Sequence, residues 1–219
     1  MRPFLSILFL LGGFLGEAAA EEAARAFLAA WMKEQAALQS LEVQFVQERN
    51  LAALKRPVES PGRLLWVRDE GFRWELGTPP RRVLLVRGGE ALVLRPERGE
   101  AERLDLEATD SAQLAPWRLQ EWLSTGSVES LEAWLKVAEA ERKGDEVTVR
   151  LLPREGASGG FRQIELRMRR EDRQLLGFAI LTVAGSRIDC RFTRVTRNPA
   201  LDPQDFRPDL SAYDFLENS

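Results

Sequence analysis

The sequence predicts an α+β fold that is mainly antiparallel β-structure, and three observations support this prediction. One amphipathic helical segment comes first, and after it the hydrophobic period changes from that of a helix to that of a strand. Turn signals then divide the chain into about eleven β-segments. A few short helical segments interrupt them. A sheet of about ten strands with short turns is antiparallel and curls towards a barrel, and the helices are expected over its concave face.

The N-terminal segment 1–20 has the pattern of a secretory signal peptide. Arg2 provides the positive charge, residues 4–15 form an apolar run, and residues 18–20 are alanines that suit a cleavage site. The apolar run is too short to cross a bilayer as a helix. We therefore expect an exported protein whose mature chain, residues 21–219, is a single domain. No cysteine lies near the cleavage site, so we expect no lipid anchor and a soluble periplasmic monomer.

The composition excludes several classes of chemistry. The chain contains no histidine, which removes Ser-His and Cys-His catalysis and most zinc sites. Its net charge of −3 argues against nucleic acid as the main partner. Cys190 is the only cysteine, so no intramolecular disulfide can form, and its apolar strand context predicts an inert buried thiol. We expect no cofactor and no metal site.

Residues 21–40 are predicted to form an amphipathic helix. Arg25 and Lys33 lie on its polar face, opposite apolar side chains at helical spacing. The apolar face consists of Phe27, Leu28, Trp31, Met32 and Leu38. The period then changes, and Val43 and Phe45 alternate with polar residues to begin the first strand.

Residues 62–76 (GRLLWVRDEGFRWEL) predict a hairpin with one strongly aromatic face. Leu64 and Trp66 share a face of the first strand, and Phe72 and Trp74 share a face of the second, with DEG as the turn. These side chains either fill an ordinary sheet core or line a cavity for an apolar ligand. Taken as a set beneath helices, they favour a lined cavity.

Alternation and turn residues define the remaining β-segments. Residues 83–87 and 91–95 form a hairpin around Gly88-Gly89, and residues 102–108 form one more strand. Three further strands are predicted near residues 161–170, 174–183 and 186–195. Asp202-Pro203 is typical of a cap followed by a first helical residue and predicts a short helical turn.

A short helix is predicted between Asp110-Ser111, which suit an N-cap, and Gly126, which ends it. Pro116 is compatible with the first turn. One apolar face consists of Ala115, Leu119, Trp122 and Leu123.

Residues 130–153 support two interpretations. Their content of Ala, Glu, Leu and Lys favours a helix through Arg142. Residues 135–152 also read as two strands joined at Lys143-Gly144-Asp145. Composition alone favours the helix for the first half.

Several segments, taken in order, resemble the LolA family of periplasmic carriers of outer-membrane lipoproteins. They are VQFVQ after the first helix, GRLLWVRDEGFRWEL, VLLVRGGEALVLRPE, PWRLQEWLSTG, VTVRLLPRE and RFTRVTRNPALDPQDF. Together they cover most of the mature chain. The resemblance implies an unclosed β-barrel with a lid of helices over an apolar cavity that receives lipid chains. It also implies strands, instead of a helix, over residues 134–141.

The resemblance gives roles to particular side chains. The lipid-binding cavity would be lined by Val43, Phe45, Leu64, Trp66, Phe72, Trp74, Leu119, Trp122 and Leu123. The family commonly has a Lys/Arg-Arg-Pro-type stretch in this hairpin, where the chain reads VRDEG, and Arg68 is the arginine that matches. Arg68 or Arg73 is expected to clasp the lid by reaching its carbonyls or acids. The alternative is that each is a solvated strand arginine.

The implied function is non-enzymatic transport of acylated lipoproteins from the inner to the outer membrane. An inner-membrane lipoprotein-releasing ABC transporter is the implied donor, and an outer-membrane receptor is a further candidate partner. The alternative is a periplasmic module of the same fold that binds lipids or glycolipids or senses lipoproteins. An enzyme with paired carboxylates near Asp105 or Asp110 is disfavoured, because chance pairs abound among so many acidic residues.

Overall fold

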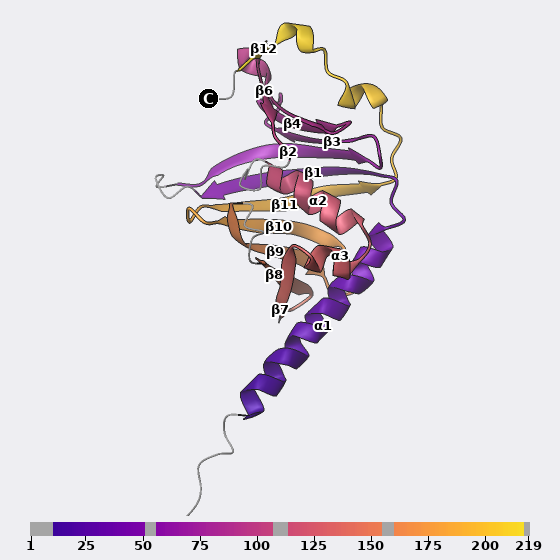
Figure 1. The fold of residues 1–219 in the computed structure, drawn as a ribbon, viewed down its shortest axis with the longest axis vertical. Helices are drawn as coiled ribbons and strands as arrows, with labels where there is room; N and C mark the ends of the chain where they lie inside the picture. Colours follow the sequence, from indigo (N-terminus) through magenta and orange to yellow (C-terminus); the bar gives the residue numbers. More distant parts are fainter. Residues whose placement is uncertain (1–10, 51–55, 107–113, 155–159, 217–219) are drawn as a thin grey trace, which may run out of the picture.

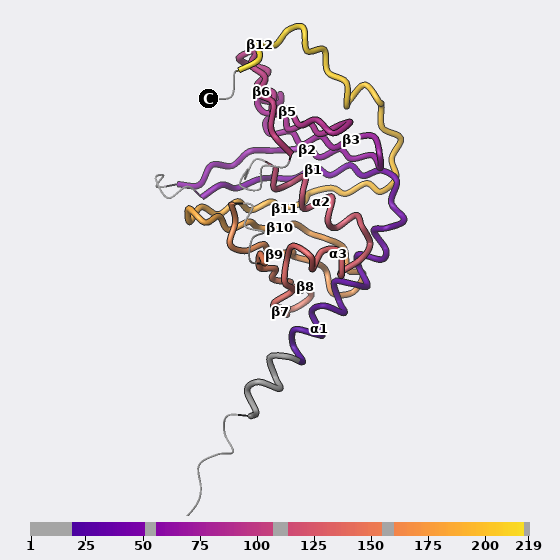
Figure 2. Tube along the Cα trace, viewed as in Figure 1, coloured from indigo at the N-terminus to yellow at the C-terminus, as the bar shows by residue number. Residues whose placement is uncertain are grey.

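The structure, a computed structural model, describes residues 11–50, 56–106, 114–154 and 160–216, with the backbone only for residues 11–18. The first half of the predicted signal segment, residues 1–10, and the predicted cap Asp110-Ser111 lie outside the described residues. The body of the molecule is one curled sheet (Figures 1 and 2).

The described residues form 12 strands in this sheet. They are β1 (Ser40–Asn50), β2 (Val58–Val67), β3 (Gly71–Leu76), β4 (Arg82–Arg87), β5 (Glu90–Arg95), β6 (Glu100–Leu104), β7 (Leu135–Lys143), β8 (Glu146–Pro153), β9 (Phe161–Arg169), β10 (Leu175–Thr182), β11 (Arg187–Arg197) and β12 (Asp214–Phe215). Their order across the sheet is β12-β6-β5-β4-β3-β2-β1-β11-β10-β9-β8-β7. Only the β12–β6 pair is parallel. Because β12 and β7 are the two ends of the sheet and do not pair, the barrel is unclosed, and the predicted fold class is confirmed with β12 as one additional strand.

Within the described residues, three helices lie on the concave side of the sheet or beside it (Figure 1). They are α1 (Leu11–Gln35), α2 (Ala115–Ser124) and α3 (Val128–Glu132), and the 3-10 turns are η1 (Pro96–Arg98), η3 (Pro203–Phe206) and η4 (Leu210–Ala212). The prediction of a helix before Gly126 is confirmed. Ala115, Leu119 and Leu123 of α2 are buried, Pro116 stands in its first turn, and Gly126 follows its end with a φ of 74°.

The predicted N-terminal helix is confirmed as α1, although it begins earlier and ends at Gln35. Its side chains Ala24, Leu28, Trp31 and Met32 are buried in the core under the concave face. Ion pairs join the polar side of α1 to α3. Arg25 contacts Glu129 at 2.7 Å and Glu132 at 3.1 Å, and both acids lie in α3. None of the described helices is both long enough and apolar enough to span a membrane.

The composition-based prediction of a helix through Arg142 is wrong. Helix α3 ends at Glu132, and β7 then pairs with β8 along its length, with Gly144 in the turn. Leu135 and Val137 are buried at the spacing of a strand face. Sheet pairing and this burial outweigh the helix propensity of the intervening Ala, Glu and Lys. The strands implied over residues 134–141 by the family resemblance are therefore the ones observed.

The two faces of the sheet have separate cores. The larger core lies on the concave face, beneath the helices. A smaller core lies on the convex face of β2–β6, where Leu65 and Leu85 pack under Phe206 of η3. Asp202 caps η3 by accepting a hydrogen bond from the backbone N–H of Gln204, so the predicted cap is confirmed. The C-terminal segment thus covers the convex face and ends as β12 on the edge of β6.

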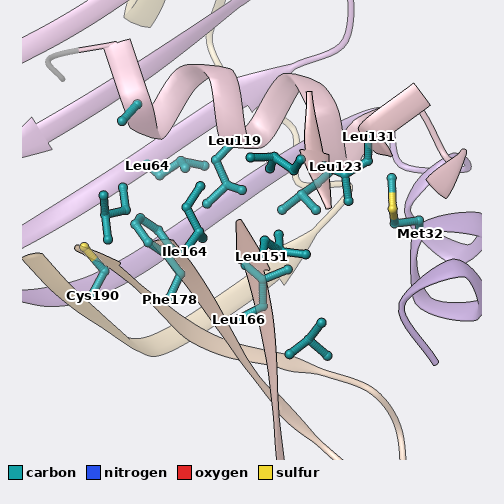
Figure 3. Packing of buried hydrophobic residues seen from close by; sticks show 14 of the residues in the cluster. Met32, Leu64, Leu119, Leu123, Leu131, Leu151, Ile164, Leu166, Phe178 and Cys190 are labelled. Atoms are coloured by element: carbon teal, nitrogen blue, oxygen red, sulfur yellow. The ribbon is translucent and has the colours of Figure 1, made fainter. Parts of the chain in front are cut away.

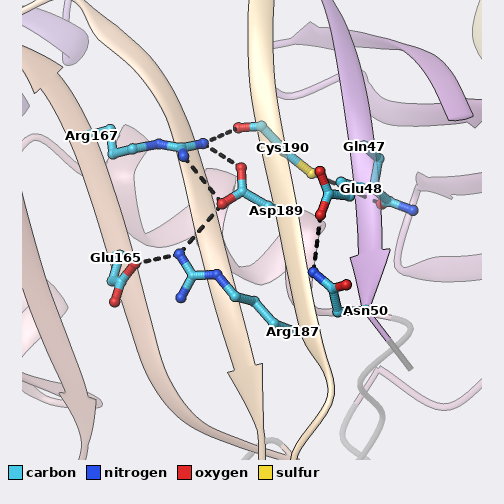
Figure 4. Close-up of polar contacts among 8 residues, drawn as sticks. All are labelled: Gln47, Glu48, Asn50, Glu165, Arg167, Arg187, Asp189 and Cys190. Atoms are coloured by element: carbon cyan, nitrogen blue, oxygen red, sulfur yellow. Dashed lines mark hydrogen bonds and ion pairs between the residues drawn. The ribbon is translucent and has the colours of Figure 1, made fainter. Parts of the chain in front are cut away.

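A chain of ion pairs crosses the convex face of β9, β10 and β11 (Figure 4). Arg187 contacts Glu165 at 2.7 Å, and Arg167 contacts Asp189 with both terminal nitrogens, at 2.5 and 3.1 Å. Arg167 also donates to the backbone carbonyl of Cys190 at 3.1 Å. These pairs join β9 to β11 across β10, on the side that faces away from the helices.

Candidate functional site

An apolar cavity lies between α2 and the concave face of the sheet (Figure 3). Its volume is about 60 Å³, and it is open at one side. Leu119 and Leu123 of α2 point down into this space, and Phe178 of β10 points up from the sheet. The sheet, α1 and the link between α1 and β1 contribute Trp31, Leu38, Val43, Leu64, Trp66 and Trp74.

A second compartment continues the cavity beneath the start of α2. Its volume is about 140 Å³, and Trp74, Pro116 and Phe178 line both compartments. Its apolar walls include Leu84, Val93, Ile180 and Cys190. The two compartments therefore adjoin each other along the concave face, with Trp74 and Phe178 between them.

Two of the predicted aromatic residues support the wall instead of forming its surface. Phe45 is buried and stacks on Trp74, with ring centroids 4.0 Å apart, and Phe72 stacks behind Trp74 at 6.5 Å. The Trp74 ring in turn meets Phe178 at 6.0 Å. The position of Trp74 in the cavity is therefore fixed by rings on three sides.

Trp122 lies elsewhere. It stacks on Trp134 with centroids 6.4 Å apart and meets the edge of Phe161, also at 6.4 Å. This cluster ties α2 to β9 and to the turn before β7, outside the cavity walls formed by Leu119 and Leu123. Six of the nine predicted residues thus line the cavity, Phe45 and Phe72 lie behind its wall, and Trp122 lies at the flank of the lid.

Arg68 joins the first hairpin to the chain that follows α1. Its Nε donates to the carbonyl of Leu38 at 2.9 Å, and a terminal nitrogen donates to the carbonyl of Ala36 at 3.0 Å. Its guanidinium carbon lies 5.3 Å from the ring centroid of Trp66, within range of a cation–π contact. Carbonyls at the end of a helix lack intrahelical partners, so an arginine there satisfies them and interacts well with the helix dipole.

Arg73 lies on the opposite face, which corrects the expectation that it could clasp the lid. Its Nε contacts Glu75 at 2.6 Å, and a terminal nitrogen donates to the carbonyl of Asp205 in η3 at 2.9 Å. Side chains alternate along a strand, so Arg73 points away from Phe72 and Trp74 and away from α2. Of the two arginines, Arg68 is the one that contacts the helical side.

Polar groups gather where α1 meets the cavity. The Nε1 of Trp31 is buried and has no hydrogen-bond partner among the described residues. Gln35 is also buried, and its Nε2 donates to the carbonyl of Trp31 at 3.4 Å. Gln120 of α2 and Gln174 line the same end. A ligand here would meet the amide and indole groups and also the guanidinium of Arg197, which lines the same cavity.

A polar groove adjoins this end on the outside. It measures about 430 Å³ and runs between the β2–β3 turn and the outer side of α2. Trp66, Gln120 and Ser124 line both the groove and the inner cavity. Glu121 on its wall is partly buried, and burial raises the pKa of this carboxyl. The apolar cavity therefore connects to a wider polar surface beside Arg68, which we call the mouth groove.

Sequence reasoning missed one wall of the cavity. Leu175 and Phe178 of β10 and Phe192 and Val195 of β11 line it beside the predicted residues. The pairing of β1 with β11 brings these C-terminal strands next to Val43. The alternation of apolar and polar residues along β10 and β11 indicated that each strand has an apolar face. Only the order of strands in the sheet shows that this face lies on the same side as the aromatic face of the first hairpin.

The family model for the outer membrane lipoprotein carrier protein LolA matches residues 36–209. The chain belongs to the LolA family. This match starts just after α1 and includes the first hairpin, the lid helix α2 and the convex cover η3. Every element that borders the cavity, apart from α1, therefore lies within the family model. No curated protein gives a significant match to the sequence.

Solved structures are similar to this chain at low sequence identity. An uncharacterized conserved protein from Thermus thermophilus has a TM-score of 0.51 at 15% identity, covering 89% of this chain and 98% of its own. A LolA superfamily protein from Nitrosomonas europaea has a TM-score of 0.41 at 10% identity, covering 81% and 96%. The MucA/MucB complex of Pseudomonas aeruginosa has a TM-score of 0.45 at 20% identity, covering 85% and 61%.

Proposed function

We propose that the protein is an exported, non-enzymatic carrier that takes up the acyl chains of lipoproteins and moves them from the inner to the outer membrane. The observation that supports this most is the apolar space between α2 and the sheet, with Trp74 shared by its two compartments. Export follows from the signal-peptide pattern at the N-terminus. The partners would be acylated lipoproteins, an inner-membrane ABC transporter that releases them, and an outer-membrane receptor.

The energetics suit lipid carriage. Burying an acyl chain is worth roughly 0.8 kcal/mol per CH₂ group, so one long chain offers on the order of 10 kcal/mol before the costs of binding. No catalytic group is required for this. The transfer of apolar surface from water to the cavity is sufficient to hold the cargo.

The size of the cavity requires the lid to move. Pockets that hold drug-sized ligands measure roughly 300–1,000 Å³. The two compartments, at about 60 and 140 Å³, are smaller. Loading would therefore displace α2 outwards, and the hydrogen bonds from Arg68 to Ala36 and Leu38 would hold the closed arrangement. The peptide part of the cargo would leave through the mouth groove.

The decisive experiment is mass spectrometry under native conditions on protein recovered from the periplasm. We expect masses of acylated peptide or lipid that disappear after delipidation. Trp74→Gln should lower the bound fraction strongly. Phe215→Gln is the matched control, because Phe215 is 41% exposed and lies on β12 at the edge of the sheet, outside the cavity. Periplasmic protein without bound acyl species, or equal loss in both variants, would contradict lipid carriage through this cavity.

A further inference from the structure

The second compartment ends in a group of arginines on the side away from Arg68. Arg49 at the end of β1 and Arg82 at the start of β4 line it together with apolar side chains such as Leu76 and Ile188. Concave-facing positions continue along β1 from Val43 and Phe45 to Arg49, so the strand that begins in the apolar core ends in a positive charge. An apolar space with cations at its rim has the form of a site for an amphiphile.

A third arginine, Arg95, strengthens the positive charge. One of its terminal nitrogens contacts Glu102 at 2.7 Å, whereas the other, Nη1, is buried without a hydrogen-bond partner among the described residues. Burial lowers the pKa of Arg82, the charges of Arg95 and Arg49 lower it further, and Glu102 acts in the opposite direction. A buried donor without a partner and mutual repulsion among cations both favour the arrival of an anion.

We propose that this end of the cavity binds the anionic headgroup, carboxylate or phosphate, of an amphiphile whose chain extends past Trp74 towards α2. This inference rests on the proposed lipid carriage and names a class of ligand for it. An anionic headgroup accepts charge-assisted hydrogen bonds from Arg49 and Arg82, which are stronger than those that a neutral headgroup accepts. From a headgroup at the arginines, the acyl chain of the amphiphile would run past Phe178 towards α2. A ligand whose polar part lay in the mouth groove would run in the opposite direction.

The test compares laurate with dodecanol, which has the same chain and no charge, by displacement of the neutral dye N-phenyl-1-naphthylamine at pH 8. In the parent protein both should displace the dye. Arg82→Gln should weaken laurate about tenfold, the equivalent of one charge-assisted hydrogen bond, and leave dodecanol unchanged. Arg82→Lys should retain part of the affinity, and added salt should reduce the preference for laurate.

Two further variants keep the result interpretable. Arg49→Gln changes an exposed residue at the rim and should also weaken laurate selectively, without loss of core packing. Arg63→Gln is the matched control, since Arg63 pairs with Glu42 away from the cavity and its loss should change neither ligand. If the arginine variants affect laurate and dodecanol equally, or affect neither, the headgroup site is wrong while lipid carriage stands. If dodecanol fails to bind the parent protein, the proposed carriage itself is wrong.

Discussion

The ring of Phe45 lies directly over Gly62 on the neighbouring strand. The register of β1 and β2 pairs the two residues, and a Cβ atom at position 62 would lie 2.2 Å from two ring carbons of Phe45. It would also lie 2.8 Å from the backbone carbonyl of Glu75. The ring cannot simply move aside, because its other face stacks on Trp74.

Gly62→Ala should therefore destabilise the protein by about 1–3 kcal/mol, the usual effect of overpacking a close-packed site. Chemical denaturation monitored by circular dichroism measures this. Ser60→Ala, two positions along the same strand, is the control and should change stability little. A parent-like midpoint for Gly62→Ala would show that the wall behind Trp74 can be repacked.

The thiol of Cys190 should be unreactive in the folded protein. It is fully buried in the second compartment, and burial raises the pKa of the thiol, so the reactive thiolate is suppressed. We expect a thiol reagent at pH 8 to label it slowly in buffer and rapidly in denaturant, with Cys190→Ser as the unlabelled control. Fast labelling under native conditions would indicate that this compartment opens readily. The rate at which Cys190 is labelled thus reports on movement of the lid.

The convex ion pair between Arg187 and Glu165 should make stability depend on pH. The hydrogen bond from Arg187 lowers the pKa of Glu165 below its usual value, with burial acting in the opposite direction. A carboxyl with a lowered folded-state pKa stabilises the protein above about pH 4.3, its value in the unfolded chain, and loses this contribution as pH falls through the folded-state value.

Arg187→Gln should therefore lower the free energy of unfolding by about 1 kcal/mol at neutral pH. The difference in this free energy between variant and parent protein should shrink below about pH 4. Urea denaturation at a series of pH values measures it. Arg98→Gln is the control, because its contact with Glu100 is 3.9 Å long and its side chain is 71% exposed. If the stability difference between variant and parent protein stays constant down to about pH 3, the destabilisation comes from lost packing and not from the lost charge.

The sequence predicts the fold better than it predicts the site, and particular residues show why. Period-two alternation gives the inward faces of Trp66 and Trp74. The same alternation places Arg73, between two inward aromatics, on the outer face, and the prediction that it could clasp the lid did not apply this. The contact of Gly62 with Phe45 depends on strand register, which no local pattern contains. Likewise Phe178 joins the wall only because β11 pairs with β1. Composition assigns Val137 to a helix because propensity is local and β pairing is not.

Loss of Arg68 should favour the open arrangement of the lid. Arg68→Leu removes two hydrogen bonds to the carbonyls of Ala36 and Leu38, each worth roughly 1.5–3 kcal/mol because the donor is charged. The closed form is then less stable relative to the form that holds cargo, so the variant should load lipid normally but release it slowly to an acceptor. Arg68→Lys should be intermediate, since lysine keeps the charge without the planar fork.

The measurement is a transfer assay between loaded protein and acceptor vesicles, together with the rate at which Cys190 is labelled. Arg68→Leu should transfer more slowly than the parent protein and label faster, because opening of α2 exposes the second compartment. Arg63→Leu removes the same charge from the other face of the sheet and should change neither rate. If Arg68→Leu transfers lipid as fast as the parent protein while labelling is unchanged, the hydrogen bonds to the end of α1 do not control the lid. The closed form would then be held by the apolar contacts of Leu119 and Leu123 and by the ring contacts of Trp122.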